Sequence, residues 1–278
     1  IKDGRKCSYK ISEKQYTQIL SINELYTTYL RYLIGVYNIS VINFCQDEYS
    51  RDLVLKLEGG LPDSLVPLCR NLMRLNGSID SLRFDLIPDE KGWFWVGEAQ
   101  IIGGGTPPAI LYRQALENSG TKINPVGEGI LPAFIRRVKK YDEEPLLVIL
   151  YSGRPDVSDI SRTTSFSGNK DFANALQKEG INTVTAFPDE LRRGKNGKLY
   201  LKNGEFIKRP ITTIYNRADW ISEIATRSLQ TQGFNDLIKV ISENKVDIFP
   251  GANPILSGKG IYALLWDKDY EYILKRDL

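Results

Sequence analysis

The sequence of 278 residues contains no histidine. A chain without histidine cannot by itself form a Ser-His-Asp triad, a Cys-His pair or a zinc site with histidine ligands. It also lacks the side chain that most often transfers protons near neutral pH. Any chemistry carried out by this chain must therefore use carboxylates, Lys, Arg, Tyr, backbone amides or a hard metal ion.

Cysteines are few and odd in number: the chain has three, Cys7, Cys45 and Cys69. They show neither CxxC spacing nor the spacing of metal ligands, which argues against a disulfide framework or a zinc site. We expect buried free thiols and a cytoplasmic protein, because thiols persist in a reducing compartment.

Long apolar runs and a strong charge imbalance are also absent. No run approaches the about 20 residues of a membrane span, and no secretory signal is visible at the start. Lys and Arg number 37 against 34 Asp and Glu, which gives a net charge of +3. We therefore expect neither a membrane nor nucleic acid among the partners.

The residues that are present predict an α/β fold with a helical beginning. Apolar residues at helical spacing run from Ser12 to Tyr37, where Ser12 and Gln15 resemble a capping box and a break is expected near Ser21. A second helical region covers 50–75, interrupted by a glycine pair. A third helix is predicted from Pro107 to Leu116.

The second half has the pattern of a parallel sheet. The run LLVILY at 146–151 follows Pro145 and is typical of a strand buried on both faces. A helix at 171–179 and a strand at 183–187 complete a β-α-β unit. Further predictions are a hairpin at 198–208 around Asn203-Gly204, strands at 211–216 and 246–249, a helix at 234–243 and a polar loop at 161–170.

Four polar residues stand out on two short segments joined by a turn. Arg83 and Asp85 alternate on the first, and Glu98 and Gln100 alternate on the second. Alternate residues of a strand share a face, so this hairpin predicts an oxygen-rich Mg²⁺ site beside a cation for phosphate. Alternation equally fits an ordinary surface hairpin with a wet face. The apolar segment 93–96 favours the functional interpretation, because it predicts a buried strand ending at Glu98 and Gln100.

Glycines follow the second segment at Gly103, Gly104 and Gly105. They allow a close approach of the backbone to a ligand and lead into a helix N-terminus. The segment Ser257-Gly258-Lys259-Gly260 does not have the spacing of a P-loop.

Together these segments resemble the circularly permuted ATP-grasp ligases, which include eukaryotic-type glutathione synthetase and glutathionylspermidine synthetase. Arg83-Phe84-Asp85 and Glu98-x-Gln100 are similar to the family's RxD…ExN signature. The segment 255–266 is similar to the family's lysine-bearing segment, and 213–217 to a strand that ends in a substrate-facing arginine. The matches run in family order from about residue 80 to residue 266.

The resemblance implies a circularly permuted ATP-grasp-like fold with a Rossmann-like domain. The expected division is 1–144 for the helical part and metal-binding hairpin, 145–252 for the Rossmann-like substrate domain, and 253–278 for the start of the ATP-binding region. The implied activity is an ATP-dependent carboxylate–amine ligase that forms an amide through an acyl phosphate. The implied cofactors are ATP and Mg²⁺, and the implied partners are small-molecule or peptide carboxylate and amine substrates.

The resemblance also assigns roles to individual residues. It places Asp85, Glu98 and Gln100 on Mg²⁺, Arg83 in catalysis as the cation that stabilises the transferring phosphoryl group, and Lys259 on the ATP phosphates. The substrate-binding residues would be Gly104, Gly105, Thr106 and Arg217, which hold acidic groups. Gln100 departs from the family's asparagine, and the chain stops at Leu278, before the family's remaining ATP-binding residues. We expect a portion of a longer enzyme, the alternative being a reduced homologue.

Two other functions fit the sequence. The first is a non-catalytic ATP-grasp-like homologue that binds an acidic metabolite or peptide. The second is an unrelated nucleotide-sugar or phosphosugar enzyme, although the loop at 152–155 lacks a GxGxxG fingerprint.

Overall fold

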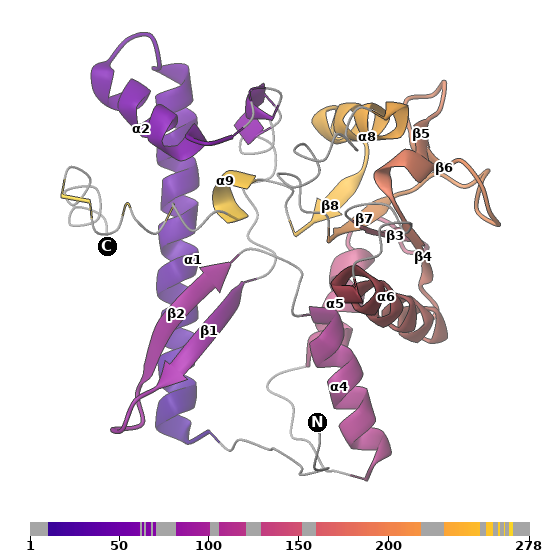
Figure 1. Cartoon of the computed structure of the whole chain (residues 1–278), viewed down its shortest axis with the longest axis horizontal. Coiled ribbons are helices and arrows are strands. Elements are labelled where there is room, and N and C mark those ends of the chain that lie inside the picture. Colours follow the sequence, from indigo (N-terminus) through magenta and orange to yellow (C-terminus); the bar gives the residue numbers. More distant parts are fainter. Residues whose placement is uncertain are drawn as a thin grey trace.

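The chain is a mixed α/β protein in the computed structural model (Figure 1). The structure describes residues 11–61, 63, 65–67, 69–70, 82–100, 106–120, 129–151, 160–217, 231–250, 254–257, 261, 264 and 267–268. At positions 83, 97–100, 108, 160–168, 254 and 257 only the backbone is described. Within this part of the chain, no helix combines the length and apolar character needed to cross a membrane.

Two helices begin the described chain. Helix α1 covers Glu13–Ile42, and its N-terminus has the predicted capping box between Ser12 and Gln15. The expected break near Ser21 is wrong: the helix is continuous, and the Ser21 hydroxyl donates to the Thr17 carbonyl at 3.1 Å within it. Helix α2, Glu48–Glu58, begins at a cap in which Asp47 accepts from the Ser50 amide at 2.7 Å.

An antiparallel hairpin lies along α1 (Figure 1). Its strands are β1, Arg83–Pro88, and β2, Phe94–Gln100. The side chain of Gln18 on α1 donates to the Phe94 carbonyl at 3.0 Å and accepts from its amide at 2.9 Å. The Phe84 ring meets Tyr26 of α1 edge-on, with centroids 5.3 Å apart. These contacts hold one face of the hairpin against the helix.

A parallel sheet forms the second part, as predicted. Its four strands are β3 (Leu146–Leu150), β4 (Asn182–Ala186), β7 (Thr213–Asn216) and β8 (Asp247–Phe249), in the order β4-β3-β7-β8. All three neighbouring pairs are parallel. Every residue of β3 is buried, which accounts for its continuous apolar sequence.

Helices cover both faces of this sheet. One face packs against α4 (Thr106–Asn118), α5 (Ile130–Val138) and α6 (Ile160–Lys178) through Ile110, Phe134 and Phe172. The other face contacts α8 (Gln232–Ser242) in a cluster that also contains α1 and the short helix α9 (Pro254–Ser257). The buried face of the first helix is therefore part of the same core as the sheet.

Two predictions in this half are wrong. The polar segment 161–170, expected to be a loop, belongs to α6, which continues into the buried residues Phe172 and Leu176. The hairpin expected around Asn203-Gly204 instead turns one motif earlier, between β5 (Leu191–Arg193) and β6 (Leu199–Leu201). The turn that joins these strands contains a different Asn-Gly pair, Asn196-Gly197, with Gly197 at a φ of 77°. The one-turn helix η2, Pro188–Glu190, precedes β5.

Candidate functional site

The hairpin brings the four predicted residues into two opposed rows. Arg83 pairs with Gln100, and Asp85 pairs with Glu98, in the antiparallel register. Directly opposed positions of an antiparallel pair lie on the same face of the ladder. The backbone therefore places both rows on one face, and the side chain of Asp85, which is described, is exposed there.

A bulge interrupts the ladder immediately beyond these rows. Asp85 pairs with Glu98, but the next residue, Leu86, pairs with Val96, so Gly97 is an extra residue in β2. A bulge changes which residues share a face, and glycine is common at such a kink. Simple alternation would put Val96 on the face of Glu98.

Because of this bulge, Trp95 takes that place. It pairs with Ile87, and both side chains are exposed, Trp95 at 67% and Ile87 at 58%. Phe84 and Leu86, the alternate residues of β1, are half-buried on the side of α1. The expectation that 93–96 forms a buried strand is therefore wrong. The outer face of the hairpin carries, in order, the rows Arg83/Gln100, Asp85/Glu98 and Ile87/Trp95.

The outer face has a donor set that suits a hard cation. Two carboxylates and an amide oxygen are the ligand types that Mg²⁺ accepts, and the register brings their backbones together. Among residues whose side chains are described, no group of three or more His, Cys, Asp or Glu could hold a metal. The side chains of Arg83, Glu98 and Gln100 lie outside that set.

A second group lies at the carboxyl edge of the parallel sheet. Arg217 directly follows β7, and its amide donates to the Leu150 carbonyl at 3.0 Å. Tyr151 directly follows β3, and its amide donates to the Ala186 carbonyl at 3.0 Å. The strand order reverses at β3, with β4 on one side and β7 on the other. In open α/β sheets, ligands bind at the carboxyl ends of the strands at such a switch point.

Two predicted substrate residues meet in this sheet-edge group. The Thr106 hydroxyl, in the first turn of α4, hydrogen-bonds to the hydroxyl of Tyr215, and Arg217 acts on the same phenol through its charge. Burial raises the pKa of Tyr215 to about 12, against the smaller opposing effects of Thr106 and Arg217. Tyr215 therefore remains a neutral hydroxyl at physiological pH.

Two members of the sheet-edge group, Tyr151 and Asn169, were not predicted from the sequence. Burial raises the pKa of Tyr151 to about 12, opposed by the Arg217 charge and the Asn169 amide. Asn169 is 2% exposed, and its side-chain amide lies beside the Tyr151 hydroxyl. A tyrosine at the end of a buried strand was a usable signal. The sequence contains no comparable signal for Asn169, because the surrounding segment has the composition of a loop.

The sheet-edge group is rich in hydrogen-bond donors. A guanidinium, two neutral phenols, a threonine hydroxyl and a buried carboxamide are grouped near the carboxyl ends of β3 and β7. Such a set favours an anion, since each donor can replace a hydrogen bond that the anion loses from water.

Three predicted site residues, Gly104, Gly105 and Lys259, lie outside the described residues. The neighbourhood of Lys259 is nevertheless partly defined. Leu256 and Ile261 are buried, and the Tyr29 hydroxyl of α1 donates to the Ile261 carbonyl at 2.6 Å. These contacts attach the flanking residues to α1, the helix that also supports the hairpin.

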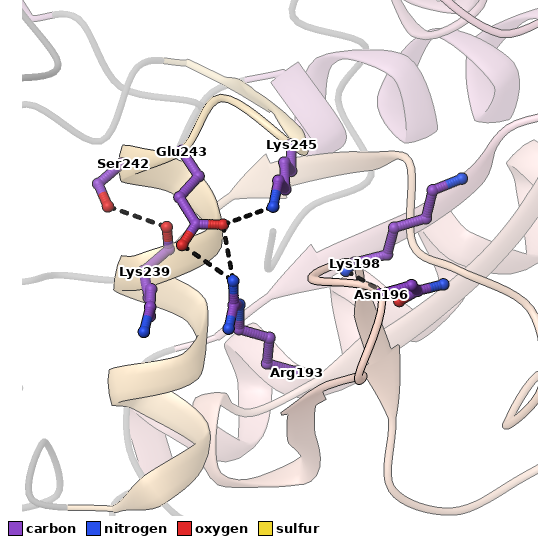
Figure 2. A network of polar contacts seen from close by, with 7 residues as sticks. All are labelled: Arg193, Asn196, Lys198, Lys239, Ser242, Glu243 and Lys245. Carbon is purple, nitrogen blue, oxygen red and sulfur yellow. Dashed lines mark hydrogen bonds and ion pairs between the residues drawn. The ribbon is translucent and has the colours of Figure 1, made fainter.

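A different polar network, at the C-terminal end of α8, has a structural role. Figure 2 shows Arg193 and Lys245 converging on Glu243, with Arg193 Nη2 at 2.9 and 2.8 Å from its two oxygens and Lys245 Nζ at 2.8 Å. The Arg193 amide donates to Asp236 at 2.8 Å. Lys245 precedes β8, so the network lies at the amino end of the sheet, opposite Arg217. It connects β5 to α8.

No model of a known protein family matches the chain, and no curated protein matches it.

Proposed function

We propose that the chain carries the metal- and substrate-binding parts of an ATP-dependent carboxylate–amine ligase of the circularly permuted ATP-grasp type. The observation that carries this proposal is the register of the hairpin, which pairs Arg83 with Gln100 and Asp85 with Glu98. The order of these residues along the chain resembles the signature of that family. The register supports the resemblance, because it places all four residues on one face, as a shared metal and phosphate site requires.

In this proposal the hairpin binds the phosphates of the nucleotide and their metal ion. Asp85, Glu98 and Gln100 would hold Mg²⁺, which when bound neutralises charge on the nucleotide phosphates. Arg83 would stabilise negative charge on the phosphoryl group during transfer. Lys259 would add a further cation for the ATP phosphates.

The sheet-edge group would hold the acidic substrate. Arg217 and Thr106 would bind a substrate carboxylate, with Gly104 and Gly105 supplying backbone amides. The hydroxyls of Tyr151 and Tyr215 are protonated at neutral pH, since burial raises both pKa values to about 12. They would therefore act as hydrogen-bonding groups rather than as bases: Tyr151 would orient the substrate, and the fully buried Tyr215 would position the Thr106 hydroxyl.

A second candidate function is a non-catalytic homologue that binds an acidic metabolite or peptide. The observation that favours it is the grouping of Thr106, Tyr151, Asn169, Tyr215 and Arg217 near the carboxyl edge of the parallel sheet. Binding of an anion at this edge requires neither the hairpin nor ATP.

The first prediction concerns Mg²⁺-dependent ATP binding. Asp85→Asn should abolish the stabilisation of the protein by Mg²⁺ and ATP, because it removes one of two paired carboxylates. Ligand at about 100 times its Kd stabilises a folded protein by about 2.7 kcal/mol, which is readily measured by thermal unfolding. The matched control is Glu90→Gln, which removes the same charge from the exposed turn of the same hairpin.

The outcomes separate the two functions. Loss of the ATP shift in Asp85→Asn with retention in Glu90→Gln supports the ligase. If the unaltered protein is stabilised by a tripeptide with two carboxylates but not by Mg²⁺ and ATP, the binding protein is correct and the ligase is wrong.

A further inference from the structure

The outer face of the β1–β2 hairpin changes from charged to apolar along its length. The row Asp85/Glu98 is followed on the same face by Ile87/Trp95, which is not predicted to bind metal or substrate. Single exposed apolar residues are normal on protein surfaces. Here two large ones stand directly opposite each other and adjoin a row of carboxylates.

The bulge at Gly97 creates this neighbourhood. The extra residue between Val96 and Glu98 shifts the alternation of side chains along β2, so that Trp95 lies on the same face as the carboxylates. Bulges occur next to functional sites, where they redirect side chains. Trp95 is the most exposed of the described tryptophans, at 67%, against 41% for Trp93.

The dimensions suit one nucleotide. Asp85 and Ile87 are two residues apart on β1, which corresponds to about 7 Å along a strand. An extended nucleoside triphosphate is longer than this, so its phosphates and its base can reach both rows. The charged row offers ligands for the metal that accompanies the phosphates, and the apolar row offers an aromatic surface.

We propose that Trp95, flanked by Ile87, stacks on the base of the nucleotide whose phosphates lie at the Asp85/Glu98 row. This inference rests on the proposed function. An indole presents a flat π surface, and stacking on it is tolerant of base identity because every base has a π face. The row therefore contributes affinity for the nucleoside and little selection between adenine and guanine.

The test compares two ligands on the full chain by calorimetry, Mg·ATP and Mg·tripolyphosphate. Trp95→Ala should weaken the binding of Mg·ATP by about tenfold or more, the effect expected when one base loses its stacking partner. The affinity for Mg·tripolyphosphate should not change. Trp95→Phe should retain most of the ATP affinity. The control is Trp93→Ala, which removes an exposed indole from the adjoining turn, where it lies under Lys14 at 4.0 Å. It should alter neither affinity.

The remaining outcomes overturn the inference in distinguishable ways. If Asp85→Asn abolishes ATP binding but Trp95→Ala does not affect it, the stacking inference is wrong and the proposed function stands. If Trp95→Ala weakens both ligands equally, Trp95 does not recognise the base. If it only changes the oligomeric state in light scattering, a second copy covers the row. If the unaltered protein binds neither ligand, the inference and the proposed function both fail.

Discussion

At the scale of single residues, buried polar side chains are stabilised by specific hydrogen-bond partners. Glu58 is a clear example, because its carboxylate is 8% exposed and accepts hydrogen bonds from Arg70 at 2.7 and 2.8 Å and from the Tyr37 hydroxyl at 2.6 Å. Burial and the neighbouring carboxylate raise the pKa of Tyr37. A buried charge is tolerated only when it is paired. This network attaches α1 and α2 to the segment that contains Arg70.

The prediction at this scale is that Arg70→Ala lowers the free energy of unfolding by about 3 kcal/mol, because Glu58 keeps a buried charge without its main partner. Arg51→Ala is the control. It removes an arginine that lies 3.9 Å from the exposed Glu48, and it should cost less than about 0.5 kcal/mol. Urea denaturation measures both values. Equal effects would show that Glu58 does not depend on Arg70.

Secondary-structure elements were largely predictable from local patterns, and the errors have physical reasons. The buried run at 146–150, the strands at 182–186 and 213–216 and the helix at 232–242 follow from apolar periodicity. The helix over 161–170 could not be predicted from apolar periodicity, because the segment is polar and is helical as the first part of α6. The strands β5 and β6 pair across Asn196-Gly197 and not across the predicted Asn203-Gly204, although both pairs carry the same local turn signal.

The prediction at the scale of elements concerns a glycine that helix propensity misjudges. Gly233 lies in the first turn of α8, where a Cβ would be 2.3 Å from the Pro188 carbonyl and 2.7 Å from that of Leu191. Gly233→Ala should therefore destabilise the protein by about 2–3 kcal/mol through overpacking.

The control for Gly233 is Gly35 in α1, whose Cβ would meet nothing within 4 Å. Gly35→Ala should stabilise the protein by about 0.5–1 kcal/mol, as helix propensity alone predicts. Thermal unfolding of both variants checks the pair. A stabilising Gly233→Ala would show that α8 does not approach the Pro188 carbonyl this closely.

At the scale of the whole molecule, the two candidate binding regions, the hairpin and the sheet-edge group, are each supported by one of two hydrophobic clusters. The hairpin is supported by α1, which shares a hydrophobic cluster with β3, β7 and α8. The sheet-edge group lies over the other cluster, which contains Tyr151 and Tyr215. The cytoplasmic location, the ATP-grasp arrangement and the ligand assignments remain predictions.

The prediction at this scale is a loss of stability in alkali. An unfolded tyrosine ionises near pH 10, whereas burial raises the pKa of Tyr151 and Tyr215 to about 12. Both contributions are complete below about pH 10 and are lost as pH rises toward 12, because the unfolded state releases its protons first. Each contributes at most about 1.4 kcal/mol per pH unit. Tyr215→Phe should reduce this slope in urea denaturation between pH 10 and 12, and an unchanged slope would contradict the burial of Tyr215.

The amino-acid sequence by itself determined the α/β class, the buried parallel strand, the capped first helix and the identity of the hairpin residues, because these depend on periodicity and local hydrogen bonding. Only the tertiary structure decided that a bulge at Gly97 puts Trp95 beside Glu98, and that Tyr151, Asn169 and Thr106 gather around Arg217. Ladder register and strand order bring together residues far apart in the chain, and no local pattern encodes that proximity.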